Sequence, residues 1–195
     1  MAQDLDDLRS HLRRLRRDLS PERQSSAAAG LLERIRDEEF FRAARRVAFY
    51  MAVAGEVSPG PLLQYALDEE KSCFLPVVAG EHDLDFVSYE AASSLVENRW
   101  GIPEPEEGTH IEPRSLDLAF VPLVGFTRDC VRLGNGKAYY DRAFAFRLTS
   151  PEPRPLLVGL GHECQLVESL PAREWDVPLD AVATPERIFY RGNRS

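Results

Sequence analysis

The chain has 195 residues, of which 44% are hydrophobic, and its 24 lysines and arginines against 32 aspartates and glutamates give a net charge of −8. This length is typical of one domain with a continuous core, and the apolar content excludes a chain that is disordered throughout. An acidic chain is repelled by a phosphate backbone, so nucleic acid is not an expected partner. Any anion that binds must therefore meet a local basic site.

The cysteines and the N-terminal segment predict a cytoplasmic protein. Cys73, Cys130 and Cys164 are far apart and odd in number, which argues against a disulfide framework and predicts buried thiols. The chain begins with an acidic segment that lacks the apolar region of a signal peptide. No stretch approaches the roughly 18 uncharged residues that a membrane span needs, so no membrane partner is expected.

Residues 4–18 predict an amphipathic helix that is rich in arginine. Leucines recur at spacings of three and four, at Leu5, Leu8, Leu12, Leu15 and Leu19. Between residues 8 and 17 the other faces carry five arginines and no acid. Such a run usually forms a solvated face, and the alternative is that one or two arginines turn inward to an anionic ligand. A module that binds a partner through this helix is the least favoured interpretation.

The rest of the chain alternates between helices and strands. Ser20 and Pro21 are typical of a helix start, and this helix is expected to run to about Glu39. Further helices are expected near 58–70 and 143–148, strands at 47–53, 73–78, 84–89, 116–122, 156–160, 181–184 and 188–190, and an irregular proline loop at 98–105. This alternation predicts a single α/β domain over residues 1–195, a three-layer α/β/α structure with a mostly parallel sheet. Ligands are expected beyond the carboxyl ends of its strands.

The stretch from Arg132 to Arg142 is the most informative part of the sequence. Gly134 and Gly136 free the backbone to turn, Lys137 stands beside them, and a helix follows. Exposed N–H groups, a helix dipole and a cation together form a cradle for an anion such as phosphate. The spacing matches neither a Walker loop nor a Rossmann fingerprint. An ordinary glycine turn with a surface lysine remains the alternative.

With its surroundings, this stretch resembles the signature of the 5-formyltetrahydrofolate cyclo-ligase family, also called 5,10-methenyltetrahydrofolate synthetases. The motif reads Pro122-Leu123-Val124-Gly125-Phe126, followed by Arg132-Leu133-Gly134-x-Gly136-Lys137-x-Tyr139-Tyr140-Asp141. Supporting matches are the arginine-rich first helix, Tyr50-Met51 with Glu56, Trp100-Gly101-Ile102-Pro103-Glu104-Pro105, and the tail from Trp175 to Thr184. The resemblance covers nearly the whole chain.

The resemblance implies an enzyme that uses MgATP to close 5-formyltetrahydrofolate to 5,10-methenyltetrahydrofolate, with release of ADP and phosphate. It also implies a fold similar to sugar-phosphate isomerases and CoA transferases. We expect the protein to be a monomer. A formamide oxygen is a poor leaving group, so its phosphorylation would give an iminium phosphate that the neighbouring folate nitrogen attacks. Phosphoryl transfer depends mainly on positioning and charge neutralisation, so such a site needs cations, backbone donors and Mg²⁺.

The resemblance also assigns residues to these roles. The expected catalytic residues are Lys137, Arg132 and Tyr139. ATP is expected to contact Arg9, Arg132, Leu133, Gly134, Asn135, Gly136, Lys137, Ala138, Tyr139 and Tyr140. The folate is expected to contact Met51, Glu56, Trp100, Tyr139 and Tyr140, and Mg²⁺ to be linked to Asp141 and Asp180.

Each of these side chains also has a plain structural explanation. Asp141 could offset a helix dipole, Asp180 could belong to a turn, and Glu56 could be a solvated loop acid. Met51 and Trp100 could simply pack on the core.

Three positions depart from the family pattern. Leu5 stands where a lysine is usual, and Arg13 could compensate for it. Ala138 replaces a usual glycine, which costs on the order of 1 kcal/mol if its φ must be positive. His162 stands where an aromatic or apolar residue is expected, and a partly buried, hydrogen-bonded histidine is the favoured explanation.

Other functions stay open beside the cyclo-ligase. Leu5 and Ala138 motivate a non-catalytic relative that binds folate or nucleotide. A sugar-phosphate isomerase of a related fold would need a general base near a phosphate clamp, and no acid in the sequence stands out for that task.

Overall fold

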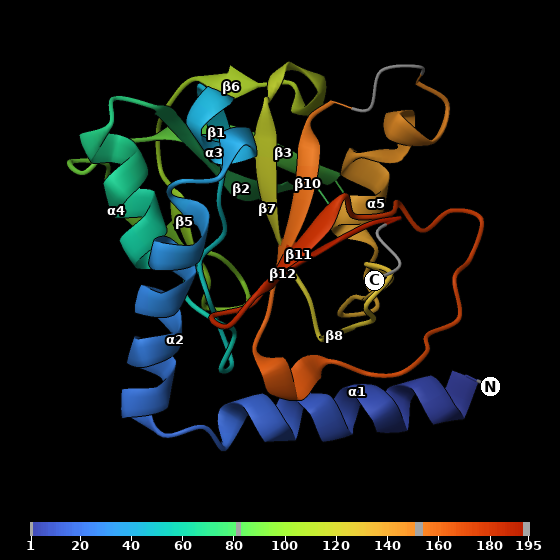
Figure 1. Ribbon diagram of the computed structural model, residues 1–195. Coiled ribbons are helices and arrows are strands. Elements are labelled where there is room, and N and C mark those ends of the chain that lie inside the picture. The colour runs from blue at the N-terminus through green and yellow to red at the C-terminus, as the bar shows by residue number, and fades with distance from the viewer. Residues whose placement is uncertain (1, 81–82, 151–153, 193–195) are drawn as a thin grey trace.

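A computed structural model describes residues 2–80, 83–150 and 154–192 and places one large sheet at the centre of the molecule (Figure 1). The strand order is β12-β11-β10-β7-β1-β2-β3-β6. The pairings from β11 through β10, β7 and β1 to β2 are parallel, and antiparallel strands complete both edges. The predicted α/β class with a mostly parallel sheet is therefore confirmed.

The helices and strands have the following bounds. The helices are α1 (Ala2–Arg17), α2 (Pro21–Ile35), α3 (Glu39–Ala43), α4 (Gly60–Asp68) and α5 (Tyr139–Ala143), with 3-10 turns η1 (Pro113–Ser115), η2 (Ala145–Leu148) and η3 (Glu163–Gln165). The sheet strands are β1 (Arg46–Ala48), β2 (Ser72–Ala79), β3 (Asp83–Tyr89), β6 (His110–Ile111), β7 (Leu118–Pro122), β10 (Leu156–Leu160), β11 (Ala181–Ala183) and β12 (Ile188–Tyr190). Two hairpins lie outside it, β4 (Leu95–Glu97) with β5 (Pro103–Pro105), and β8 (Gly125–Phe126) with β9 (Arg132–Leu133).

Both faces of the sheet are buried, as a parallel sheet requires. Along β7, Leu118 and Phe120 pack with α2, α3 and α4, whereas Ala119 and Val121 pack with the aromatic side chains of α5 and η2. The alternation along one strand thus separates two apolar clusters. These layers give the predicted α/β/α arrangement.

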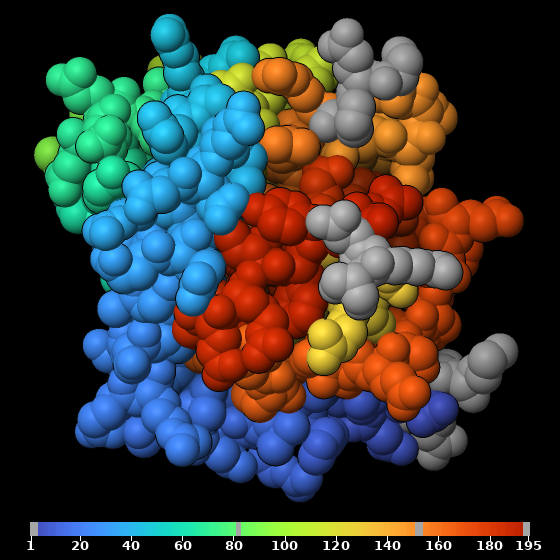
Figure 2. Space-filling model, viewed as in Figure 1, coloured from blue at the N-terminus to red at the C-terminus, as the bar shows by residue number. Residues whose placement is uncertain are grey.

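Helix α1 lies across the base of the molecule, below the ends of the strands, rather than on a sheet face (Figures 1 and 2). Its leucine stripe packs against Val124 and Leu133, with Leu12 buried at the centre of the contact. The predicted helix over 4–18 is confirmed, with its end at Arg17. In the described part of the chain, no helix is both long and apolar enough to cross a membrane.

The strand predicted over 47–53 is much shorter than expected. Strand β1 ends at Ala48, one further sheet bond joins Phe49 N to Phe74 O, and the chain then turns away. Ala54 and Gly55 adopt positive φ values of 51° and 77°. An apolar run predicts burial but not pairing, so its length did not reveal where the backbone leaves the sheet.

The loop predicted over 98–105 was also partly wrong, because β5 pairs antiparallel with β4. Asn98 N bonds Ile102 O, and Glu106 N bonds Ser94 O. In this ladder, therefore, Ile102 and Glu106 are hydrogen-bonded positions of the second strand. Pro103 and Pro105 fall between them, where a strand nitrogen donates no bond in this ladder. Two prolines spaced by two residues are therefore compatible with this edge hairpin.

The helix bounds differ from prediction at two places. The helix expected to reach Glu39 ends at Ile35, and α3 forms separately. The helix expected over 143–148 begins earlier, at Tyr139, and continues after Ala143 as a 3-10 turn. The three cysteines are free, but only Cys73 and Cys130 are buried as predicted, and Cys164 is half-buried.

His162 is a buried histidine whose neutral form the fold requires. Its side chain is 4% exposed, and its Nε2 is buried without a hydrogen-bond partner among the described residues. Burial, helped by the charge of Arg16, lowers the pKa of His162 to about 4 despite an opposing backbone hydrogen bond at Gly55. Below its ordinary pKa the unfolded chain therefore binds a proton that the folded chain refuses.

We expect acid to destabilise the wild type through His162 and His162→Phe to remove this loss. Between the ordinary pKa near 6.5 and the folded value near 4, the free energy of unfolding should fall by about 1.4 kcal/mol per pH unit as the pH decreases. Urea unfolding at pH 7 and pH 5 would measure an excess loss of about 2 kcal/mol in the wild type relative to the variant. Equal losses in both proteins would contradict the assignment.

Candidate active site

A cavity of about 850 Å³ opens at the carboxyl ends of the central strands, as expected. Its walls include Tyr50 and Met51 after β1, Val78 of β2 and Pro122 of β7. Of the residues singled out in the sequence, it is lined by Arg9, Met51, Glu56, Trp100, every residue from Arg132 to Tyr140, and Asp141. Asp180 does not belong to this lining.

The loop between β9 and α5 forms one wall of the cavity and turns sharply. Gly136 adopts φ +94° and Ala138 φ +53°, so the backbone turns twice through the left-handed region. Helix α1 holds this loop from below: Arg9 Nε donates to Gly134 O at 3.0 Å, and a guanidinium nitrogen of Arg13 donates to Asn135 Oδ1 at 3.0 Å. Two cations therefore lie against the loop, although Arg13, unlike Arg9, does not line the cavity.

The positive φ at Ala138 predicts a stabilising substitution. Ala138→Gly removes a Cβ from left-handed backbone, which we expect to raise the free energy of unfolding by about 0.5–1 kcal/mol after the entropy of glycine in the unfolded chain is counted. Urea unfolding would measure the gain. Ala143→Gly in α5 is the matched control and should have the opposite sign. A loss of stability in Ala138→Gly would contradict the strain at this position.

Lys137 lies on the indole of Trp100. Its Nζ is 4.3 Å from the ring centroid, and the guanidinium of Arg99 lies 4.1 Å from the centroid of the same indole. The ring of Tyr139 meets Trp100 edge to face at 6.1 Å. Trp100 is in the turn between β4 and β5 and is 38% exposed, so it forms part of the cavity rim rather than a cover for the core.

Arg132 and Asp141 form an ion pair beneath the loop. A terminal guanidinium nitrogen of Arg132 lies 2.6 Å from Asp141 Oδ1, which also accepts a bond from Val177 N at 3.2 Å. The Arg132 side chain passes close to Gly134, since a Cβ there would come within 3.4 Å of the guanidinium. Asp141 therefore joins α5, β9 and the segment before β11 at one point of the wall.

Glu56 is a buried carboxylate that also lines the cavity, and it is not the solvated loop acid of the alternative interpretation. It is 7% exposed, its Oε1 lies 3.2 Å from a terminal nitrogen of Arg16, and its Oε2 accepts a bond from Val53 N at 3.2 Å. Burial raises the pKa of Glu56, while the charge of Arg16 opposes this rise. Tyr140 also faces this carboxylate, and burial together with the nearby Glu56 raises the pKa of its hydroxyl.

Asp180 is separate from this group of residues. It precedes β11, where its Oδ1 accepts from Arg147 at 2.9 Å and its Oδ2 accepts from Leu157 N at 2.7 Å. These bonds hold the start of β11 beside β10. The structure therefore does not bring Asp180 together with Asp141 at the cavity wall.

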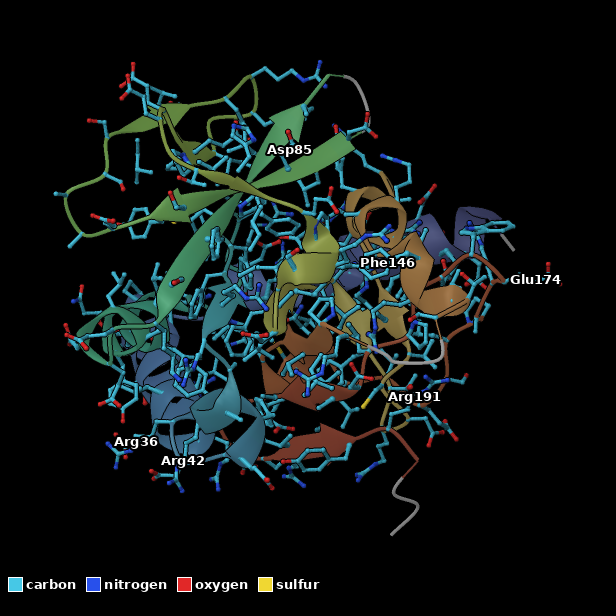
Figure 3. The ribbon with its side chains drawn as sticks, turned by 90° about the horizontal axis from the view of Figure 1, so that it is seen from above. Arg36, Arg42, Asp85, Phe146, Glu174 and Arg191 are labelled. Carbon is cyan, nitrogen blue, oxygen red and sulfur yellow. The ribbon has the colours of Figure 1, made fainter. Side chains whose placement is uncertain are left out.

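Several lining residues were not singled out in the sequence. The segment from Leu170 to Pro178 closes one side of the cavity and carries the 60% exposed Trp175. Glu174 of this segment lies at the outer edge of the molecule (Figure 3). Arg36 and Arg42 project from the other side of the molecule, near α2 and α3. Trp175 to Pro178 belong to the tail matched to the family in the sequence, but no contact with the cavity was expected for them, and the residues from Leu170 to Arg173 were not singled out.

Comparison with known proteins identifies relatives of this chain. A family model described as the 5-formyltetrahydrofolate cyclo-ligase family matches residues 2–185. The chain is 36% identical over 185 residues to the 5-formyltetrahydrofolate cyclo-ligase of Escherichia coli K12, covering 91% of this chain and 98% of that protein. It is 28% identical over 183 residues to the mouse protein of the same name, covering 90% of each.

The fold is likewise similar to a solved structure of this kind. The 5,10-methenyltetrahydrofolate synthetase of Aquifex aeolicus, determined by NMR, superposes with a TM-score of 0.84 at 31% sequence identity, covering 98% of this chain and 95% of that one. The match of the family model along nearly the whole chain and the identity to the E. coli protein establish the relationship. The chain therefore belongs to the 5-formyltetrahydrofolate cyclo-ligase family, and it is an enzyme.

Proposed function

We propose that this enzyme converts 5-formyltetrahydrofolate to 5,10-methenyltetrahydrofolate and that ATP drives the reaction, with ADP and phosphate as the other products. The observation that supports this most is a single cavity lined by two kinds of subsite. One wall is the turn with Lys137, which suits a phosphate chain, and another carries the buried carboxylate of Glu56. A reaction that joins a nucleotide phosphate to a one-carbon unit on a pterin needs both within one cavity.

In the proposed reaction the formyl oxygen attacks the terminal phosphorus of ATP, and ADP leaves. The carbon then belongs to an iminium phosphate, which the second folate nitrogen attacks to close the ring, and phosphate is expelled. Lys137 would approach the transferred phosphoryl group, while the backbone N–H groups of residues 134–138 would bind the remaining phosphates. Arg9 and Arg132 would neutralise charge from below the loop. The protein supplies position and charge, and no covalent nucleophile is required.

On the folate side, Glu56 would accept two parallel hydrogen bonds from the amino-pyrimidinone edge of the pterin. Met51 would give an apolar contact, and Trp100, Tyr139 and Tyr140 would place aromatic rings along the substrate. All five side chains line the same cavity, which supports this arrangement.

The donor set also fits a magnesium ion that travels with the nucleotide. In the parts of the chain that the structure describes, no three His, Cys, Asp or Glu side chains lie close enough together to hold a metal ion. Mg²⁺ commonly keeps several waters and binds through one or two carboxylates plus substrate phosphates. Asp141, on the cavity wall, would be the protein carboxylate, and Mg²⁺ would supply further charge neutralisation to the phosphates. Asp180 bonds Arg147 and Leu157 N and does not line the cavity, so it is not assigned to the ion.

An assay of ADP release, with and without 5-formyltetrahydrofolate, tests this function. We expect ADP to form only when the folate is present, in equal amount with the ultraviolet absorbance of the methenyl product, and chelation of Mg²⁺ to stop both. ATP and folate binding without ADP release would favour a non-catalytic binder. Product formation without ATP consumption would contradict the proposed driving reaction.

We also propose that the protein works as a single-domain monomer in the cytoplasm. The cavity walls come from one chain and from segments spread between Leu5 and Arg191, so the site needs no second copy. Light scattering of the active enzyme should give the mass of one 22.0 kDa chain. A dimer that is required for turnover would contradict this.

A further inference from the structure

Arg16 is a fully buried cation, which is unusual for a residue in an arginine-rich surface helix. Its relative exposure is 1%, whereas its neighbour Arg17 is exposed. The guanidinium makes three contacts: Nε with Ala54 O at 3.1 Å, one terminal nitrogen with Leu123 O at 3.0 Å and the other with Glu56 Oε1 at 3.2 Å. Burying a charge is costly unless it is paired and hydrogen-bonded, so these contacts form a built site rather than an incidental one.

The backbone around this guanidinium is closely fitted. Gly55 approaches α1 so tightly that a Cβ there would lie 2.9 Å from Arg16 O, and its φ is +77°. Gln24 of α2 bridges the same place, since its Nε2 donates to Arg16 O at 2.8 Å and to Gly55 O at 3.3 Å. The turn that carries Glu56 is thereby fastened to α1.

The carboxylate of Glu56 is held from a second direction as well. Asn135 of the glycine loop lies beside Glu56 and lowers its pKa, and the same Asn135 accepts from Arg13. Arg13 and Arg16 lie on one helix, so α1, the loop and Glu56 form a closed circuit of polar contacts. A carboxylate held in this way has a defined orientation toward the cavity that it lines.

We propose that Arg16 is a positioning residue, which holds Glu56 as an oriented carboxylate for the folate. This proposal rests on the function proposed above, because it takes Glu56 as the contact to the pterin. Arg16 itself does not line the cavity. It acts only through Glu56, and its loss should weaken folate binding far more than nucleotide binding.

The ionisation of Glu56 supplies a readout that a merely structural arginine would not affect. Arg16 from α1, Tyr50 after β1, Tyr140 of α5 and Asn135 of the loop face this carboxylate. Both tyrosines have raised pKa values and stay neutral, so Arg16 is the cation that opposes the burial of Glu56. Without Arg16 the pKa of Glu56 should rise further, and the folate site should regain affinity as the pH increases.

The first experiment measures KM for both substrates in Arg16→Met, Arg16→Lys and the control Arg14→Met. Arg14 lies on the same helix but is exposed, with a contact to His11. For Arg16→Met we expect KM for 5-formyltetrahydrofolate to rise at least tenfold at pH 7 and to recover in part by pH 9, with KM for ATP changed less than threefold. Arg16→Lys should lie between Arg16→Met and the wild type, and Arg14→Met should match the wild type. An unchanged folate KM in Arg16→Met would overturn the proposal, as would equal rises for both substrates.

A double-mutant cycle with Glu56→Gln decides whether Arg16 acts through Glu56. Once Glu56 is replaced, Arg16→Met should raise the folate KM no further, and independent, multiplying effects would overturn the proposal. If Arg16→Met does not fold, as judged by urea unfolding, Arg16→Lys carries the same cycle. If the wild type shows no turnover, the proposed function fails, and the positioning role is still decided by calorimetric affinities for 5-formyltetrahydrofolate in the same variants.

Discussion

We expect Lys137→Ala to lower kcat/KM by at least about a hundredfold, more than any other single substitution in the cavity. The side chain is exposed at the cavity rim and its Nζ rests on the face of Trp100, 4.3 Å from the centroid. A cation held by an exposed cation–π contact is worth about 0.5–1 kcal/mol, so a phosphate chain can draw it away readily. Removing it takes away charge neutralisation that is needed most when the phosphoryl group is in transit.

Initial rates of ADP and product formation would measure this loss. The matched control is Arg99→Ala, because Arg99 is a second cation on the same indole but does not line the cavity. Arg99→Ala should keep kcat/KM within a factor of about three, since no transferred group reaches it. Wild-type turnover in Lys137→Ala would remove Lys137 from the mechanism.

The second large effect is expected for Glu56→Gln, which should raise KM for 5-formyltetrahydrofolate by about ten- to a hundredfold. An amide has only one acceptor oxygen, so the parallel pair of bonds to the pterin edge is lost, along with the charge that strengthens it. Losing a charge-assisted bond typically costs about 1.5–3 kcal/mol, which agrees with that range. The substitution also leaves the buried Arg16 without its counter-charge, so a lower urea midpoint should accompany the change.

Steady-state kinetics with each substrate varied in turn would check this. Glu56→Asp keeps the charge but shortens the side chain, and its folate KM should lie between those of the wild type and Glu56→Gln. A rise confined to the KM for ATP would place Glu56 on the nucleotide side and contradict the assignment.

The predictions from sequence were most accurate where the relevant residues are neighbours in the chain. The glycine loop, Lys137 and Asp141 fall within ten residues, and the structure places all of them on one wall. The departure at Ala138 is also visible in the sequence, and its backbone does adopt a positive φ. Local backbone preferences act over a few residues, so a sequence can display them directly.

The sequence did not predict which side chains from distant segments contact each other. The two metal-linked aspartates were predicted together, yet Asp180 holds Arg147 and Leu157 at the start of β11 while Asp141 pairs with Arg132. Nothing in the spacing of these residues encodes which arginine each carboxylate meets. The same is true of the residues from Leu170 to Arg173, which line the cavity without any pattern in the sequence that predicts it.

The sequence by itself determined the alternation of helices and strands, the leucine stripe of α1 and the phosphate-type loop, because hydrophobic periodicity and glycine content are local properties of the chain. Only the tertiary structure decided which of five similar arginines is buried. Arg16 follows Leu12 by four residues and so shares its buried side of the helix, but a partner 40 residues away, Glu56, makes that burial tolerable. The free energy of burying a charge depends on the groups that surround it in space, and the order of residues alone does not reveal those groups.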